Sequence, residues 1–244
     1  MSANVRRRLD QVKRTSSKIR RVSGQSGCHL CSQIVGDREN DLIARLLPGQ
    51  AYIRRVVLDS ESFAAIPSLG PLSDGHLLLC PRAHVCSAAA LPRSIYAEYE
   101  AVKDRLVRFL EKQYQTAVHV FEHGMGSAGR TVCTVDHAHV HLVPLPEHMP
   151  RLGLDGPTWQ AFDGRLDTLA AMARGHEYVA YIPPDGQPVV CISEAARIES
   201  QYMRQAIARA LGSRSWNWRT EPHAIAAHRI WHRCVSHQRP QLAG

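Results

Sequence analysis

The sequence predicts an α+β fold, because segments with strand and helix patterns occur together along the chain. Short apolar runs rich in β-branched residues and bounded by Gly or Pro are typical of strands. Such runs occupy residues 52–58, 75–81, 117–121 and 135–145. Residues 95–114 carry apolar side chains near helical spacing, with Pro92 and Ser94 as start signals, so they predict a helix.

The chain beyond Pro150 predicts an additional α/β segment. Its pattern gives a helix over 159–173, two short strands around a Pro-Pro-Asp-Gly turn, and a helix over 200–211. The polar residues near the C-terminus predict no regular structure, and the two tryptophans at 216 and 218 are interpreted as packing residues. The organisation is therefore a basic, flexible arm, a main domain and a C-terminal extension, at residues 1–24, 25–150 and 151–244.

The net charge of +8 is concentrated at the N-terminus. Residues 1–21 hold eight Lys or Arg and one Asp, which leaves the remaining chain nearly neutral. Such an arm either contacts phosphate-rich partners such as nucleic acid or is a solvated terminus, and we favour the second interpretation. The folded body does not need to attract nucleic acid.

The sequence favours a cytoplasmic protein. No apolar run approaches the ~20 residues that span a bilayer. The basic N-terminal stretch lacks the apolar region of a secretory signal. The cysteine count of seven is odd, which favours a reducing compartment in which a Cys-x-x-Cys pair binds metal or does redox chemistry.

The segment at residues 137–142 alternates histidines with apolar residues. On a strand, successive side chains point to opposite faces, so His137, His139 and His141 share one face. Three imidazoles in a row are poor core material, because each brings a polar nitrogen that needs a partner. A solvated strand face is the alternative, but imidazoles in this pattern better suit metal ligation or nucleophilic work near neutral pH.

The His-Ala-His-Val-His-Leu-Val run at 137–143 resembles the signature of the histidine triad (HIT) superfamily. Two other segments agree in order and spacing: the Cys-His-Leu-Cys run at 28–31, and the Gly-His-Leu-Leu-Leu-Cys-Pro-Arg-Ala-His run at 75–84. The resemblance covers roughly residues 28–148. It implies an antiparallel sheet of about five strands flanked by helices. It also implies a homodimer, although the extension could cover the surface through which the two subunits would meet.

The resemblance also implies roles for individual residues. His139 would be the nucleophile, His141 would contact the α-phosphate and help the leaving group depart, and His76 would support this pair. Zinc would be held by both cysteines and two histidines, namely Cys28, Cys31, His84 and His137. Four N/S ligands close a tetrahedral site, so the zinc would be structural. A redox pair is the alternative for the cysteines.

Four further residues are candidates for substrate binding. Ser68 falls where some family members place a ribose-binding Asp, and Thr134 could supply a hydroxyl near the phosphate. His123 ends a strand close to the triad, where it either binds substrate or caps a turn. Arg204, near the start of the helix at 200–211, could reach the distal part of the substrate or belong to an ordinary surface helix, which we slightly prefer.

The resulting functional prediction is nucleotidyl transfer at an α-phosphate through a covalent His139–nucleotidyl intermediate. Water as acceptor gives a hydrolase, whereas phosphate, ammonia or a sugar phosphate gives a transferase. The triad performs only the first half-reaction, so it fits both. The alternative from another class is a nucleotide- or nucleic-acid-binding protein without turnover. A zinc-dependent hydrolase is a third hypothesis, and it requires an open metal position.

Overall fold

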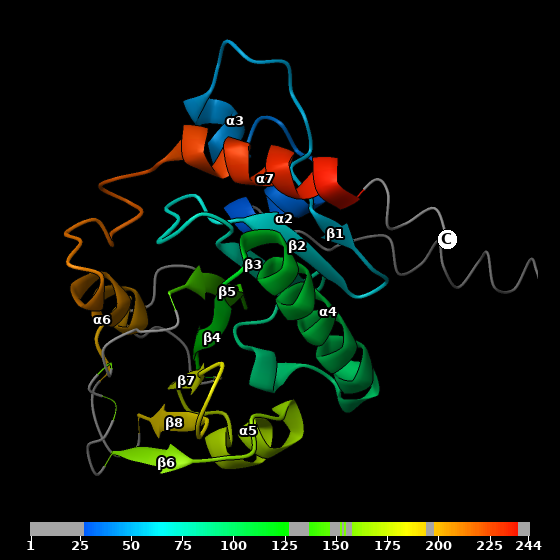
Figure 1. The fold of residues 1–244 in the computed structure, drawn as a ribbon. Coiled ribbons are helices and arrows are strands. Elements are labelled where there is room, and N and C mark those ends of the chain that lie inside the picture. Colours follow the sequence, from blue (N-terminus) through cyan, green and yellow to red (C-terminus); the bar gives the residue numbers. More distant parts are fainter. Residues whose placement is uncertain are drawn as a thin grey trace, which may run out of the picture.

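The computed structural model describes residues 27–126, 137–146, 152, 154, 158–193 and 198–238. Its centre is one sheet of eight strands in the order β1-β2-β3-β5-β4-β7-β8-β6, in which every neighbouring pair is antiparallel (Figure 1). The strands are β1 (Leu58–Asp59), β2 (Phe63–Pro67), β3 (Leu77–Pro81), β4 (Ala117–Gly124), β5 (Val140–Leu145), β6 (Trp159–Ala161), β7 (Tyr178–Ile182) and β8 (Val189–Ile192).

The described helices surround this sheet. They are α2 (His29–Val35), α3 (Leu42–Leu46), α4 (Tyr96–Tyr114), α5 (Leu166–Ala173), α6 (Tyr202–Ala210) and α7 (Ala224–Gln238), with 3-10 turns η1 (Ala88–Ala90) and η2 (Arg93–Ile95). Among the helices of these described ranges, none has both the length and the apolar character of a membrane span.

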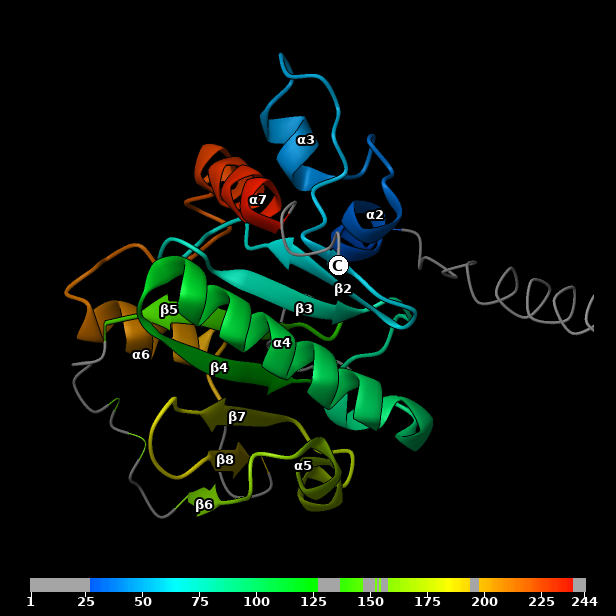
Figure 2. The ribbon, with the colours of Figure 1, turned by 45° about the vertical axis from the view of Figure 1, so that its right-hand side comes forward.

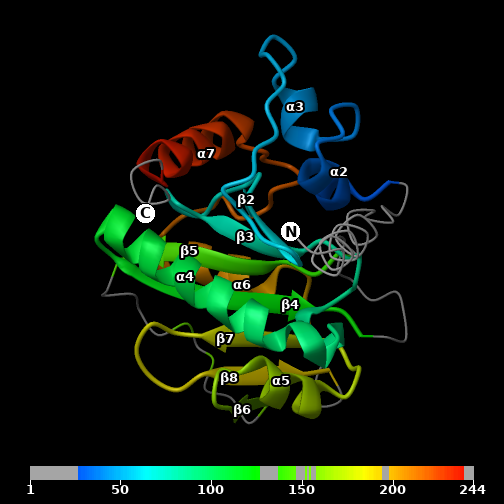
Figure 3. The same cartoon turned by 90° about the vertical axis from the view of Figure 1, so that its right-hand side faces the viewer.

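The two faces of the sheet are covered by different helices. Helices α4 and α5 lie on one face, and α6 lies on the other (Figure 3). Helix α2 packs on the same face as α6 but at the β2–β3 end, through Leu30 and Ile34. Between α2 and α6 lie His76, which directly precedes β3, and His141 of β5. The helix arrangement therefore places the triad strand in the gap between two covering helices.

The predicted α+β class is confirmed: the described part of the main domain supplies five strands, β1–β5, of a sheet that has eight strands in all. The extension adds β7, β8 and β6 to the same sheet, because β7 pairs with β4 from Val120 to Gly124 (Figure 2). A strand edge has unpaired backbone N–H and C=O groups, and a following segment of the chain can satisfy them. The extension thus continues the main domain's sheet instead of forming its own.

Several element boundaries differ from the prediction. Of residues 52–58 only Leu58 is in a strand, whereas the pattern did not indicate β2. The predicted strand 135–145 begins at Val140, so His137 and His139 precede it. The predicted helix 159–173 is a strand, β6, followed by the shorter α5. The remaining predicted helices and strands are observed with end shifts of a few residues.

Helix α7 was not predicted, because its sequence is rich in His and Arg. Its buried positions are Ala224, Ala227, Ile230 and Cys234, whose spacing of three, three and four residues follows one helical face. This narrow stripe packs against β2 and α3. A search for helical periodicity among small residues would have found it.

Glu122 gives the fold a pH-dependent element on the α4 side of the sheet. It is buried, and it accepts hydrogen bonds from the Tyr178 hydroxyl and the Ala88 N–H. Burial raises the pKa of its carboxyl from 4.5 to about 7. The folded state therefore holds a proton more tightly than the unfolded state, and this contribution to stability is lost as the pH rises through about 7.

Replacing Glu122 with Gln should therefore flatten the pH dependence of stability. In the wild type, the free energy of unfolding should fall between about pH 5 and about pH 8 by an amount that Glu122→Gln removes. Urea titrations of both proteins at these pH values measure it. Parallel pH profiles for the two proteins would contradict the assignment.

Candidate active site

His141 is held from both sides on β5. Its ring stacks on Phe121 of β4, with centroids 4.3 Å apart and planes 10° apart. On the other side, its Nδ1 lies 2.8 Å from Nε2 of His76, which precedes β3. The backbone register explains this arrangement, because His141 pairs with Phe121 on one side and Leu78 on the other. The imidazole therefore has one fixed orientation.

The hydrogen bonds also fix where the protons lie on this pair. The Leu72 N–H donates to Nδ1 of His76 at 3.0 Å. Nδ1 is then an acceptor, so the proton of neutral His76 is on Nε2 and is donated to Nδ1 of His141. Burial lowers the pKa of both rings well below the usual value. Neutral His141 must consequently carry its own proton on Nε2, its remaining ring nitrogen.

His139 has the opposite tautomer. Its Nδ1 lies 2.7 Å from the carbonyl oxygen of His137, so Nδ1–H is the donor. Burial lowers the pKa of His139 to about 4, although this backbone hydrogen bond acts in the opposite direction. The ring is therefore neutral near pH 7, and Nε2 holds the lone pair. The side chain is partly exposed, so this nitrogen can meet a substrate.

Cys28, Cys31, His84 and His137 form a cluster whose ligand atoms all lie within 4.8 Å of one another. Nδ1 of His137 is 3.5 Å from Sγ of Cys28 and 3.2 Å from Sγ of Cys31. Nδ1 of His84 is 3.4 Å from Sγ of Cys31. Metal–sulfur bonds of ~2.3 Å and metal–nitrogen bonds of ~2.0–2.1 Å give a tetrahedral sulfur–nitrogen edge of about 3.6 Å. These separations suit a four-coordinate metal.

The chemistry of these donors agrees with their spacing. His137 donates Nε2–H to the Pro81 carbonyl at 2.8 Å, which leaves Nδ1 available to a metal. Hydrogen bonding from Cys31, opposed by burial and aided by His137, lowers the pKa of the Cys28 thiol to about 3. A thiolate is the form that binds metals. No disulfide is present among the described cysteines.

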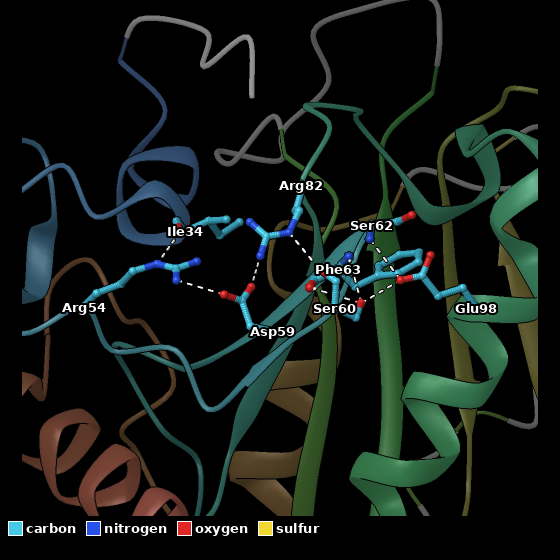
Figure 4. A network of polar contacts seen from close by, with 8 residues as sticks. All are labelled: Ile34, Arg54, Asp59, Ser60, Ser62, Phe63, Arg82 and Glu98. Atoms are coloured by element: carbon cyan, nitrogen blue, oxygen red, sulfur yellow. Dashed lines mark hydrogen bonds and ion pairs between the residues drawn. The ribbon is translucent and has the colours of Figure 1, made fainter. Parts of the chain in front are cut away.

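A polar network around Asp59 joins the end of α2 to the turn after β3 (Figure 4). Arg54 donates from Nε to the Ile34 carbonyl near the end of α2 at 2.7 Å, and from Nη1 to Asp59 at 2.9 Å. Asp59 also pairs with Arg82, which stands two residues before His84. Asp59 thereby links the helix that carries Cys31 to the turn that carries His84.

An open pocket lies next to the triad, with about 450 Å³ of empty space that includes solvent at its mouth. Its lining includes the second and third histidines of the triad, His139 and His141. It also includes His29 and Gln33 of α2, Ser68 after β2, and Trp218 of the extension. The Nε2 of Gln33 is buried and has no hydrogen-bond partner. The rest of the lining is apolar, namely Leu30, Leu42, Ile43, Pro67, Leu69 and Leu78. The pocket thus combines apolar walls with a few polar groups, as small-molecule sites usually do.

The other predicted substrate-binding residues lie in different places. His123 is on β4 and bonds to Glu177 at 2.7 Å. Arg204 is buried, and it donates to the carbonyls of Trp216 at 2.8 Å and Gly70 at 2.5 Å, away from the cavity lining. Thr134 and the basic arm lie outside the described residues.

Arg204 instead holds the segment that carries Trp218. A Cβ on Gly70 would lie 2.5 Å from Cβ of Trp218, so only glycine permits this approach. The Trp218 ring then lines the cavity, with its centroid 5.5 Å from that of His29. The prediction that this tryptophan only packs is therefore incomplete.

Sequence reasoning missed His29, Gln33, Trp218 and Glu177 as residues near the site. His29 and Gln33 could have been found, because a helix that begins at the cysteine pair places residues four apart on one face. Trp218 and Glu177 belong to the extension, and no local pattern joins them to the triad.

The match to known families lies over the triad. Residues 52–148 match the family model of the HIT domain. No curated protein sequence matches the chain. Similar solved structures include a Streptococcus mutans protein with 26% identity, covering 50% of this chain and 68% of that chain at a TM-score of 0.39.

Two other similar structures carry family names. A HIT family member from Bacillus subtilis has 18% identity, 50% and 76% coverage of the two chains and a TM-score of 0.39. A zinc-bound histidine triad family protein from Mycobacterium smegmatis has 24% identity, 43% and 73% coverage and a TM-score of 0.33. Residues 52–148 of the chain are therefore a HIT domain, the domain of the histidine triad superfamily.

Proposed function

We propose that the protein transfers a nucleotidyl group from a nucleotide conjugate, with His139 as the nucleophile. The observation that carries this proposal is the pair of hydrogen bonds that assign opposite tautomers to His139 and His141. Nε2 of His139 has a lone pair, because Nδ1–H is bonded to the His137 carbonyl. Nε2 of His141 has a proton, because Nδ1 faces His76. One site thus combines an electron-pair donor for phosphorus and a hydrogen-bond donor for a phosphate oxygen.

In the first half-reaction, Nε2 of His139 forms a bond to the α-phosphorus while the bond to the leaving group breaks. His141 donates from Nε2–H to an oxygen around that phosphorus, where negative charge accumulates, and His76 keeps His141 in this orientation. In the second half-reaction, an acceptor forms a bond to phosphorus and the phosphorus–nitrogen bond returns its electrons to His139. Water gives a hydrolase, and another nucleophile gives a transferase.

The cysteine–histidine cluster is proposed to hold a structural zinc ion. Its ligands would be Cys28, Cys31, His84 and His137, whose donor atoms fit a tetrahedral ion. Four protein ligands leave no open position, which favours a structural role over a zinc-dependent hydrolase. The ion would tie α2 to the turn before β5, and this fixes the backbone carbonyl that orients His139. Thiolate ligands of this kind suit a reducing, cytoplasmic setting.

The nucleoside part of the substrate is proposed to occupy the cavity next to the triad. Ser68 would face the ribose, and the unpartnered amide nitrogen of Gln33 would face the base. Trp218 and His29 would supply the flat apolar contact that a base needs.

A homodimer and nucleic-acid contact through the basic arm also stay proposals. In the described sheet the open edges are β1 and β6, which are only two and three residues long.

Ser68 motivates a prediction on sugar selectivity. We expect weaker discrimination between ribonucleotides and 2′-deoxyribonucleotides than an Asp at this place would give. A neutral hydroxyl that loses its partner costs less than a buried charge that loses one. The ratio of kcat/KM for the two sugars, in wild type and in Ser68→Ala, measures it. A strong ribose preference that survives Ser68→Ala would place sugar recognition elsewhere.

The substrate class is tested with a panel of AMP and GMP conjugates. The panel comprises phosphoramidates, dinucleoside polyphosphates, nucleotide sugars and adenylyl sulfate, each offered with water and with phosphate as acceptor. Mass spectrometry identifies the released group and the nucleotide product. Release of nucleoside monophosphate or its phosphorolysis product supports turnover. Tight binding of the conjugates without any product would instead support a nucleotide-binding protein.

A further inference from the structure

A further histidine on the triad face, His123, is paired with a carboxylate from the extension. His123 donates from Nε2 to Oε1 of Glu177 at 2.7 Å. Both side chains are nearly buried, at 10% and 7% exposure. The remaining ring nitrogen of His123, Nδ1, is buried and has no hydrogen-bond partner. With its proton on Nε2, this imidazole keeps an unused lone pair on Nδ1.

The sheet register places His123 beside the nucleophile. Phe121 of β4 pairs with His141 of β5. That is the last pair of these two strands, and continuing its register by two residues would set His123 across from His139, which directly precedes β5. Opposite Cβ atoms in such a sheet lie about 4.5–5.5 Å apart. In agreement, a charge on His123 lowers the pKa of both His139 and His141.

The triad itself provides no base for the second half-reaction. Nε2 of His139 is bonded to phosphorus in the intermediate. Nε2 of His141 carries a proton, and both ring nitrogens of His76 are in hydrogen bonds. A water or alcohol acceptor must lose a proton as it attacks. Near the nucleophile on this face, among the described strand residues, Nδ1 of His123 is a buried ring nitrogen without a hydrogen-bond partner.

We propose that His123, oriented by Glu177, is the base that deprotonates the acceptor; this rests on the proposed function above. Nδ1 of His123 takes the proton of the acceptor O–H as the oxygen–phosphorus bond forms. The phosphorus–nitrogen bond breaks, and its electron pair returns to Nε2 of His139. The carboxylate of Glu177 stabilises the imidazolium, which then releases the proton to water. A base held by a third group is a recurring catalytic arrangement.

This proposal gives the extension a chemical role. Glu177 stands immediately before β7, and its backbone carbonyl accepts from the Ser193 N–H at 2.8 Å. A Cβ on Gly126 would lie 3.0 Å from the Glu177 backbone nitrogen, so the chain after β4 packs tightly against this residue. Pairing of β7 with β4 therefore brings the carboxylate to His123. A HIT domain without the extension would lack this partner.

The test separates the two half-reactions with a nucleoside monophosphate p-nitrophenyl ester, whose p-nitrophenolate leaves without needing a proton. His123→Gln should keep a burst of about one p-nitrophenolate per site and accumulate the adduct on His139. Its steady-state turnover with water should fall by about 10²–10⁴-fold. Glu177→Gln should show the same pattern to a smaller degree. Fluoride, an acceptor with no proton to lose, should restore turnover of both variants as the nucleotidyl fluoride.

His119→Gln is the matched control. His119 is on the same strand and face, and it also has a polar partner, the Tyr181 hydroxyl at 2.6 Å from its Nδ1. Four residues along a strand separate it from His123 by about 13 Å, so turnover should be unchanged.

Three results would overturn the inference: normal water turnover in His123→Gln, loss of the burst itself in a folded variant, or slow turnover that fluoride does not restore. If His123→Gln does not fold, Glu177→Gln decides by the same readouts. A wild type without burst or adduct would instead refute the proposed function.

Discussion

Replacing His139 with Ala should lower turnover by several orders of magnitude while the fold and zinc content stay unchanged. Loss of a covalent nucleophile removes a whole reaction path, which costs far more than a positioning defect. The side chain is partly exposed and hydrogen-bonds to the His137 carbonyl, so its removal should cost only about 1 kcal/mol of stability. Turnover of the substrate found in the conjugate panel, zinc content and melting temperature measure the three quantities.

Chemical rescue provides the control for this result. His139→Gly leaves space for an imidazole, so added imidazole should restore part of the activity, whereas it should leave the wild type unchanged. His139→Asn should behave as the Ala variant, because an amide is not a nucleophile for phosphorus. If His139→Ala turns over near the wild-type rate, the triad is only a binding surface.

Replacing Cys28 with Ser should lower zinc content and thermal stability together. Structural zinc binding contributes ~10–16 kcal/mol in small zinc domains. If even about 3 kcal/mol of this is lost here, the melting temperature of a chain this long should fall by about 6–12 °C. The expected zinc content of the wild type is about one ion per chain. Metal analysis and thermal unfolding on the same samples measure both effects.

Cys86→Ser is the matched control for the metal prediction. Cys86 is exposed and is not in the ligand cluster, so its replacement should change neither zinc content nor melting temperature. Full zinc occupancy in Cys28→Ser would show that the cysteine pair does not bind the metal. A fall in stability without loss of zinc would show that Cys28 acts only through packing.

The sequence predicted the parts of the site that short motifs encode. The three histidines, the Cys-x-x-Cys pair and the Gly-His segment carry their spacing in one stretch of chain each. Because side chains alternate along a strand, His139 and His141 share one face. A helix that begins at Cys28 brings Cys31 back to the same side as Cys28. The structure brings all four proposed ligands together without a further assumption.

The contribution of the extension could not be predicted in this way. Pairing of β7 with β4 is a long-range contact, and Glu177 approaches His123 only because of that pairing. Trp218 enters the cavity wall because Arg204 and Gly70 fix its segment, although these residues are far apart in sequence. The polar surface of α7 hid its narrow apolar stripe. In each case the interaction that positions the residue joins segments far apart in sequence, and the local pattern of neither segment indicates the contact.

Trapping the covalent intermediate tests the central claim most directly. Wild-type protein is mixed with a nucleotide conjugate that it turns over, quenched under denaturing alkaline conditions, digested and sequenced by mass spectrometry. We expect one nucleotidyl group on a histidine within residues 137–141, located at His139, stable in alkali and lost in acid. The His139→Ala sample should carry none. An adduct on another residue, or full turnover by wild type without any protein adduct, would contradict the account.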